Sequence, residues 1–244
     1  MNSVLKYIGK MKNIHLCEYI DINKYSLYVE PFAGSFNCGF NMIEDGYTGK
    51  CILNDKDSLV VNFWKCVKEE PLKLYGTILK EHENLLSNKI TLNKLLSDKD
   101  KYKRAAYQYI YSQYNNINKI KNSGSIHLDI SNIIQCSDML QEVKIINLDF
   151  KDVIQEYNSD KTLFLIDPPY KISRVDKYYR CNSSEFNHEA LRNLTDIIKG
   201  DWIIRYNDNK YTNMLYNNIE KLFETNKTLF GSQYKEIYYT NILR

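Results

Sequence analysis

Short apolar runs alternate with segments of helical periodicity near the start of the chain. Residues 26–30 form the first run and lead into the turn 31–35, before a helical pattern over about 37–45. A second run at 50–53 precedes a helical pattern over about 58–67. Strands and helices that alternate at such short spacing are typical of parallel βαβ units. The first part of the chain is therefore predicted to begin a parallel sheet.

The same alternation returns in the second half of the chain. The expected strands there are 144–147, 163–166, 202–206 and 236–240, and the expected helices are 150–157, 189–198 and 214–223. Between them and the first part, residues 71–140 are polar and rich in Lys, Asn and Tyr, with helical periodicity up to about Tyr114. Asn122-Ser123-Gly124 is typical of a hairpin turn. We expect one α/β domain, formed by residues 1–70 and 141–244, with an inserted, mainly helical domain at 71–140.

The positive charge of the chain is concentrated in this predicted insertion. The whole chain carries a net charge of +3. Between residues 71 and 127, ten Lys or Arg stand against four Asp or Glu, a net +6, so the remainder sums to −3. A segment of this kind is either a solvated helical face or a surface that binds nucleic acid.

Cysteine usage and hydropathy bear on metals, membranes and compartment. Six cysteines are scattered without a CxxC pair, and the four histidines stand apart from them, which argues against a zinc site or a disulfide framework. No apolar run approaches the roughly 18 residues that cross a bilayer, and the N-terminus lacks the apolar stretch of a signal peptide. We expect a protein of the reducing cytoplasm that binds neither metal nor membrane.

The sharpest chemical signal is Asp167-Pro168-Pro169-Tyr170, directly after the expected strand 163–166. Two prolines stiffen the backbone at the carboxyl edge of the sheet, where open α/β sheets bind ligands. The Asp167 carboxylate and the Pro168 carbonyl can each accept one N–H of a planar exocyclic amine, and Tyr170 can stack on its ring. The alternative is an ordinary turn that stops a strand. We expect all four residues to be catalytic.

Three further segments place small or acidic residues where strands are expected to end. The turn after the first strand can bring backbone N–H groups close to a ligand. Asp55 follows Gly34 by 21 residues, a spacing that suits a carboxylate binding ribose hydroxyls. Asp149 and Phe150 suit an adenine ring, or alternatively a helix N-cap beside a core Phe. The cofactor-binding candidates are Glu30, Pro31, Phe32, Ala33, Gly34, Ser35, Asp55, Asp149, Phe150 and Asp167.

In this order, Glu-Pro-Phe-x-Gly, Leu-Asn-Asp, Asp-Phe and Asp-Pro-Pro-Tyr resemble the motifs of the Dam-type DNA adenine-N6 methyltransferase family. The resemblance covers roughly residues 4–68 and 143–244. It implies a Rossmann-like methyltransferase sheet, mostly parallel with one antiparallel strand near the C-terminus. It also implies that S-adenosylmethionine is the cofactor, converted to S-adenosylhomocysteine, and that the methyl group goes to N6 of an adenine flipped out of double-stranded DNA.

The resemblance implies further contacts. Tyr7 and Lys10 are expected to contact the cofactor, and Phe186, His188 and Leu191 match a family segment that follows the catalytic loop. The insertion becomes the target-recognition domain, in which the clustered tyrosines are expected to form helix core more often than base-stacking platforms. Residues 171–180 are expected to close over the flipped base. The DNA-binding candidates are Lys101, Lys103, Arg104, Lys119, Lys121, Asn122, Gly124, Lys171, Arg174, Lys177, Tyr179 and Arg180.

Two classes of alternative stay open at this point. One is another amino-group methyltransferase, acting on cytosine N4, RNA adenine or protein glutamine, although Asp at position 167 favours adenine in DNA. The other is a catalytically silent nucleic-acid-binding homologue. We further expect a monomer or a weak dimer on DNA, in a bacterial cell or from a phage that acts in the host cytoplasm.

Overall fold

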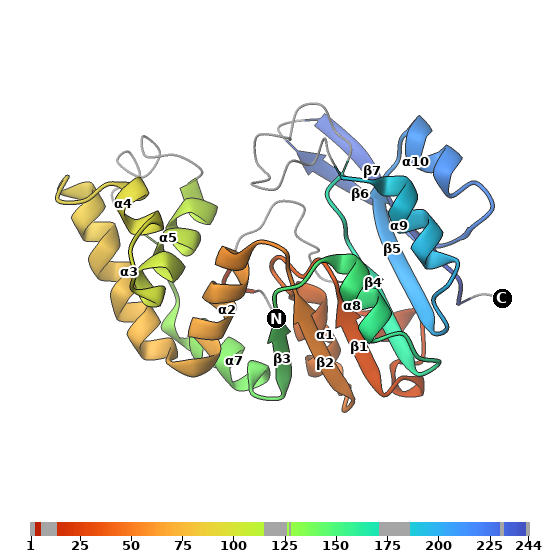
Figure 1. Ribbon diagram of the computed structural model, residues 1–244, viewed down its shortest axis with the longest axis horizontal. Coiled ribbons are helices and arrows are strands. Elements are labelled where there is room, and N and C mark those ends of the chain that lie inside the picture. The colour runs from red at the N-terminus through yellow and green to blue at the C-terminus, as the bar shows by residue number, and fades with distance from the viewer. Residues whose placement is uncertain are drawn as a thin grey trace.

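The computed structural model describes residues 3–5, 14–114, 126, 128–170, 186–229 and 232–242, and its centre is a seven-stranded sheet (Figure 1). The strands are β1 (Leu27–Glu30), β2 (Lys50–Asn54), β3 (Val143–Ile146), β4 (Thr162–Ile166), β5 (Asp201–Asn207), β6 (Glu220–Leu229) and β7 (Ser232–Thr240). Their spatial order is β3-β2-β1-β4-β5-β7-β6. Only β7 runs against its neighbours, pairing antiparallel with both β5 and β6. The predicted mostly parallel α/β sheet with one antiparallel strand is confirmed.

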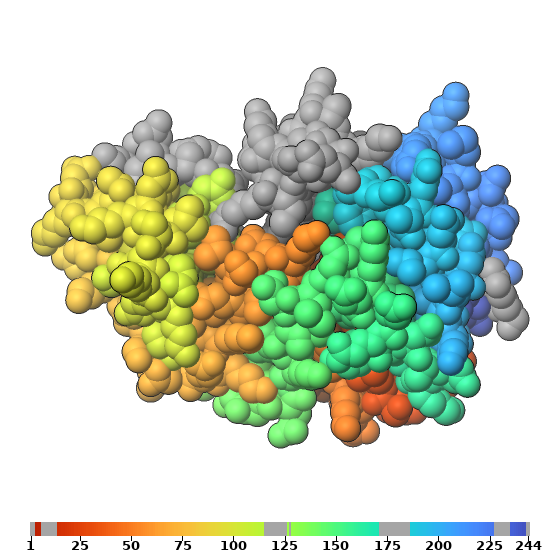
Figure 2. All heavy atoms as spheres, in the orientation of Figure 1, coloured from red at the N-terminus to blue at the C-terminus, as the bar shows by residue number. Residues whose placement is uncertain are grey.

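Helices pack on both faces of this sheet because side chains alternate along each strand. In β4, Leu163 and Leu165 join one hydrophobic cluster, while Phe164 and Ile166 join the other. The helices involved are α1 (Asn37–Glu44), α2 (Ser58–Glu69), α8 (Phe150–Glu156), α9 (His188–Thr195) and α10 (Lys210–Leu215). Figure 2 shows the face of the molecule that α8 and α9 cover. The two-sided burial explains why β4 is apolar at every position.

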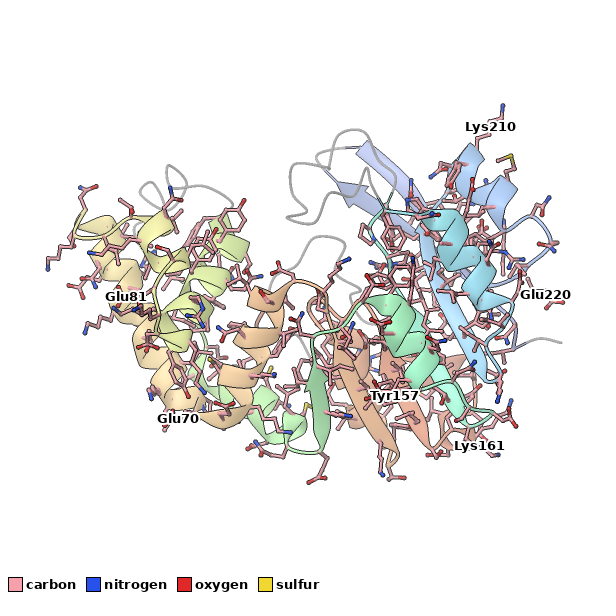
Figure 3. The ribbon with its side chains drawn as sticks, in the orientation of Figure 1. Glu70, Glu81, Tyr157, Lys161, Lys210 and Glu220 are labelled. Atoms are coloured by element: carbon pink, nitrogen blue, oxygen red, sulfur yellow. The ribbon has the colours of Figure 1, made fainter. Side chains whose placement is uncertain are left out.

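Four described helices lie within the predicted insertion: α3 (Pro71–Leu86), α4 (Leu92–Leu96), α5 (Lys101–Tyr114) and α7 (Ile130–Leu140). They pack beside α2 at one end of the molecule (Figure 1). The ring of Tyr109 on α5 stacks on Phe63 of α2, with 6.2 Å between the ring centroids. Glu70, labelled in Figure 3 where α2 meets α3, accepts a hydrogen bond from the Tyr102 hydroxyl. The insertion therefore shares one hydrophobic core with the sheet.

The tyrosines of α5 largely follow the core interpretation. Tyr102, Tyr107 and Tyr109 are buried, whereas Tyr111 and Tyr114 are half-buried.

None of the described helices is long and apolar enough to cross a bilayer. The predicted hairpin around Gly124 lies outside the described residues.

One predicted element is wrong. The helix expected over 214–223 is replaced by the end of α10 at Leu215 and by strand β6, which begins at Glu220. Apolar residues recur there at helical spacing, but pairing with β7 decides the structure. Phe223 stacks on Tyr238 of β7 and on Tyr19, with centroid distances of 4.1 and 4.2 Å. This tertiary packing overrides the local pattern.

The loop that enters β5 leaves no room for a side chain at Gly200. A Cβ atom there would lie 2.2 Å from the carbonyl oxygen of Thr162 and 2.5 Å from that of Ser159. The loop is also tied to Asn241, whose Nδ2 donates to the Gly200 carbonyl at 3.1 Å. Because both obstructing atoms are backbone, they can move little.

Gly200→Ala is therefore expected to lower the free energy of unfolding by about 1–3 kcal/mol through overpacking. Gly76→Ala is the matched control, because Gly76 lies within α3 and a Cβ there meets nothing within 4 Å. That variant should gain roughly 0.5–1 kcal/mol from higher helix propensity. Urea unfolding followed by circular dichroism measures both changes, and equal stabilities for the two variants would contradict the prediction.

Candidate active site

Asp167-Pro168-Pro169-Tyr170 follows β4 at the carboxyl edge of the sheet, between the ends of β1 and β5. In Figure 3, Tyr157 and Lys161 mark the opposite edge, where α8 ends and β4 is about to begin. The chain order reverses between β1 and β4, which makes this the point where ligands of open α/β sheets bind. The side chain of Asp167 is 20% exposed, whereas Tyr170 is buried.

The carboxylate of Asp167 is held by a forked pair of hydrogen bonds from Arg205 of β5. Nε of Arg205 donates to Oδ1 at 2.9 Å, and Nη2 donates to Oδ2 at 2.5 Å. Nη1 of the same guanidinium donates to Oε2 of Glu236, on β7, at 3.4 Å. Arg205 and Glu236 are each 1% exposed. A carboxylate, a guanidinium and a second carboxylate thus form one network across β4, β5 and β7.

Burial raises the pKa of Asp167 to about 6, and the adjacent Arg205 guanidinium opposes that rise. Asp167 is therefore mainly ionised at neutral pH. An ionised carboxylate can accept hydrogen bonds but cannot donate them. Each of its oxygens has a further lone pair beyond the one that Arg205 uses.

Aromatic rings surround this network on the β5 side. The ring of Tyr170 lies 6.0 Å from that of Tyr206, and the Arg205 guanidinium lies 5.6 Å from the Tyr170 centroid. The Tyr206 hydroxyl lies 2.7 Å from Nδ1 of His188. Phe186, whose ring is 4.9 Å from that of His188, extends the group. Phe186 and His188, which the family resemblance singled out, are thus linked through Tyr206 to Tyr170.

The turn after β1 is closed by contacts within the protein. Gly34 has a φ of +46°, a conformation that glycine adopts without steric cost. Its N–H donates to Oδ2 of Asp55 at 2.9 Å, and its carbonyl accepts from Nε1 of Trp64 at 2.9 Å. The Ala33 N–H donates to the Asn54 carbonyl at 2.8 Å. The amides of Ala33 and Gly34, expected to approach a ligand, bind the end of β2 instead, because Asp55 and the Asn54 carbonyl reach them.

Neighbouring residues of this turn are also engaged. Oε1 of Glu30 accepts hydrogen bonds from the Tyr28 hydroxyl at 2.8 Å and from the Gly39 N–H at 2.7 Å, and burial raises the pKa of Glu30 to about 8. Ser35 is buried and its hydroxyl accepts from Nδ2 of Asn37 at 3.0 Å. Glu30 and Ser35 therefore brace the turn from inside.

Asp55 is buried at the end of β2. Besides the Gly34 amide, it accepts the N–H of Asp57 at Oδ1, at 2.8 Å. Burial raises its pKa to about 7, and these backbone N–H donors act against the rise.

Asn54, one residue earlier, joins three turns of the sheet edge. Its Nδ2 donates to the carbonyls of Pro31 and Leu148 at 2.8 and 3.1 Å, and its Oδ1 accepts the Leu148 N–H at 2.9 Å. The side chain is fully buried. A single amide thereby fixes the ends of β1, β2 and β3 relative to one another.

Asp149 and Phe150 begin α8. Oδ1 of Asp149 accepts the Lys151 N–H at 3.1 Å as the N-cap, and Oδ2 pairs with Nζ of Lys56 at 2.8 Å. Partial burial acts to raise the pKa of Asp149, but the Lys56 ammonium and the Lys151 amide outweigh it and the pKa is lowered. Phe150 packs 5.3 Å from Phe32 between ring centroids. The N-cap and core interpretation of this pair is confirmed, and its contact with adenine stays a prediction.

The described DNA-binding candidates make contacts within the insertion or with the end of α2. Lys101 pairs with Glu69, Lys103 pairs with Asp98 at 3.1 Å, and Arg104 donates to the carbonyls of residues 98 and 99 at 2.6 and 2.9 Å. Two cofactor-binding candidates, Tyr7 and Lys10, lie outside the described residues. So do the remaining DNA-binding candidates: Lys119, Lys121, Asn122, Gly124, Lys171, Arg174, Lys177, Tyr179 and Arg180. Within the described ranges, no group of three or more His, Cys, Asp and Glu side chains could hold a metal ion.

The structure thus brings together Glu30, Asp55, Asp149 and Asp167, which end four adjacent strands or begin the turns after them. The sequence assigned no role to Asn54, although it lies in the Leu-Asn-Asp motif, nor to Arg205 or Glu236. Arg205 could have been noticed, because a charge inside the apolar run 202–206 requires a buried partner. Its partners are distant in sequence, so only the strand order identifies them.

Known proteins give this geometry a context. Residues 10–229 match the family described as D12 class N6 adenine-specific DNA methyltransferase. The chain is also 24% identical over 189 residues to the Type II methyltransferase M.MjaIII of Methanocaldococcus jannaschii. That alignment covers 66% of this chain and 65% of the relative, just under two thirds of its length.

Asn54→Asp is expected to lower the free energy of unfolding by about 2–4 kcal/mol at pH 7, because it removes both donated bonds and buries a carboxylate against two carbonyls. Asn158→Asp is the matched control: Asn158 also donates to one carbonyl and accepts one N–H, but it is only half-buried and both hydrogen bonds are exposed. Its cost should stay within about 1 kcal/mol. Urea unfolding compares the two variants, and similar losses would contradict the role assigned to Asn54.

Proposed function

Because the chain belongs to the D12 class N6 adenine-specific DNA methyltransferase family, we propose that it transfers a methyl group from S-adenosylmethionine to N6 of an adenine in double-stranded DNA. The observation that carries this proposal is the ionised, partly exposed Asp167 beside two prolines at the switch point of the sheet. The relative's name, a Type II methyltransferase, supports a role in a restriction–modification system.

In the proposed reaction, Asp167 and Pro168 hold the target amine. An exocyclic amine has two N–H groups, and the Asp167 carboxylate and the Pro168 carbonyl are acceptors on adjacent residues of a stiff turn. Accepting both N–H groups draws the nitrogen lone pair out of conjugation with the ring. The base has to leave the duplex to reach this edge, so the enzyme is proposed to flip it. Tyr170 is proposed to contact the face of the flipped base.

The residues at the ends of β2 and β3 fit S-adenosylmethionine. Asp55 is a buried carboxylate whose oxygens each have a lone pair beyond their amide contacts, which suits ribose hydroxyls. Asp149, with Phe150 and Phe32 beside it, suits an adenine ring. The cofactor supplies an electrophilic sulfonium methyl group, and a cluster of carboxylates complements its positive charge. Tyr7 and Lys10 are proposed as further contacts.

We assign residues 1–70 and 141–244 to cofactor binding and catalysis, and residues 71–140 to recognition of the DNA target. Lys101 and Lys103 are proposed to contact phosphates although they pair with acids in the free protein. Exposed ion pairs contribute only about 0–1 kcal/mol each, so a phosphate can replace the acidic partner at little cost. Binding to DNA through such contacts weakens as salt concentration rises.

The test is transfer of a labelled methyl group from S-adenosylmethionine to unmethylated DNA, RNA and protein, followed by nucleoside analysis. Label is expected in N6-methyladenine of DNA. Asp167→Asn should reduce the rate constant about a hundredfold or more, because the amide has one acceptor oxygen in place of two and no charge. Cofactor binding, measured by calorimetry, should largely survive. Label in any other product, or an Asp167→Asn variant as fast as the wild type, would overturn the proposed role.

The pH dependence of kcat at saturating cofactor and DNA should follow Asp167. With a pKa of about 6, the carboxylate that accepts the N6–H is present above that pH and is lost as the pH falls through it. The rate should be constant near pH 8 and fall about tenfold per unit well below pH 6. Circular dichroism at each pH controls for unfolding. A kcat that stays constant down to pH 5 in folded enzyme would be inconsistent with this assignment.

A further inference from the structure

Behind Asp167, two buried charged residues have no part in the mechanism described so far. We propose that Arg205 is a positioning residue that fixes the Asp167 carboxylate for the target amine, and that Glu236 keeps the cluster negatively charged as positive charge develops on N6. This inference rests on the proposed function and adds to it the residues that determine how Asp167 acts.

The first argument is geometric. The Arg205 guanidinium is planar, and its Nε and Nη2 donate to the two different oxygens of Asp167, at 2.9 and 2.5 Å. Such a fork fixes the plane of the carboxylate as well as its position. Arg205 is itself immobilised, because it is 1% exposed and a third nitrogen donates to Glu236. The lone pairs of Asp167 that are left for a substrate therefore point in one fixed direction.

The second argument is the balance of charge. Asp167 and Arg205 alone sum to zero formal charge, and such a pair offers little to a cation. Glu236 returns the three groups to a formal charge of −1. In a buried setting this charge is screened less than in water and is correspondingly more effective. Burial raises the pKa of the nearby Glu30 to about 8, so this acid is mainly protonated at neutral pH and does not replace Glu236.

The reaction needs this charge. N6 donates its lone pair to the methyl carbon while the carbon–sulfur bond breaks and its electron pair remains on sulfur. N6 then carries a positive charge until one of its two protons passes to water. The methylated, positively charged N6 is itself a strong acid, so water can take this proton and Asp167 is not required as a general base. A fixed acceptor with a net negative charge behind it stabilises the cationic nitrogen instead.

The third argument is cost. Buried ion pairs often contribute less stability than apolar side chains of similar volume. Arg205 lies within the otherwise apolar run Trp202 to Tyr206, where an apolar residue would pack without desolvating a charge. Cys38, Tyr170 and Tyr238 are further titratable side chains that interact with this guanidinium. All three are neutral at neutral pH, since burial raises the pKa of each. The network therefore contains no other acid beside Asp167, Glu236 and the mainly protonated Glu30 among the described residues.

The experiment compares Arg205→Lys and Glu236→Gln with the wild type in kcat, KM for DNA and the pH profile of methyl transfer. Arg205→Lys keeps the charge and loses the fork, so kcat should fall about tenfold or more with KM little changed. The acid limb of its pH profile should move to higher pH. Without the forked guanidinium, the rise that burial causes in the pKa of Asp167 is less strongly opposed. Glu236→Gln should also lower kcat, but its acid limb should move to lower pH, because a neighbouring negative charge is removed.

Glu224→Gln on the adjacent strand β6 is the matched control, since Glu224 pairs with the exposed lysines Lys221 and Lys235. It should behave as the wild type. A merely structural role of the network would lower the amount of folded enzyme without shifting the two acid limbs in opposite directions. Thermal melts and cofactor calorimetry establish the folded fraction of each variant.

Wild-type values of kcat and an unmoved acid limb in both variants would overturn the inference while leaving the proposed function intact. Should Arg205→Lys fail to fold, the nearly isosteric Glu236→Gln decides alone, and an unchanged kcat in that variant overturns the inference. Absence of N6-methyladenine with the wild-type enzyme is a different outcome, because it removes the proposed function on which the inference rests.

Discussion

The carboxyl ends of parallel strands must meet at one edge without leaving buried polar groups unpaired. At this edge the amide of Asn54 satisfies that constraint for three strands, by bonding to Pro31 after β1 and to both backbone groups of Leu148 after β3. Asp55 extends the arrangement by accepting the Gly34 amide. The turns that carry the proposed cofactor contacts are thus set by bonds within the protein. The site is preorganised for its ligand before any ligand binds.

A second consequence concerns the acids that end these strands. Burial raises the pKa values of Glu30 and Asp55 to about 8 and 7, whereas the pKa of Asp149 is lowered by Lys56 and the Lys151 amide. Four carboxyl groups at one edge therefore differ in their fraction ionised at neutral pH. This spread limits mutual repulsion among the acids and still leaves anionic groups for the proposed cationic cofactor. The same edge can both fold stably and attract its ligand.

The sequence predicts most of the sheet because its signals are local. Short apolar runs and short strand–helix spacing identify β1 to β5 and β7, and the proline pair after β4 identifies the edge proposed to be active. Strand β6 was not predicted, because Phe223 and its neighbours have helical spacing. Their pairing with β7, which includes the stacking of Phe223 on Tyr238, makes them a strand. The roles of Arg205 and Glu236 were not predicted for a related reason: the residues that they contact come from other strands. Local pattern identifies elements, whereas the sheet order determines which distant side chains meet.

The packing of Tyr109 on Phe63 has a consequence for how the proposed recognition of DNA by residues 71–140 can change its target. The helices of the insertion share a hydrophobic core with α2, and Trp64 of α2, next to Phe63, supports the Gly34 turn. A chimaera that exchanged residues 71–140 alone would break this core. Transplantation of a new specificity would have to carry α2 with it, or be built up by surface substitutions on an unchanged scaffold. Selection for new targets would thus act on exposed side chains and loops before it acted on whole modules.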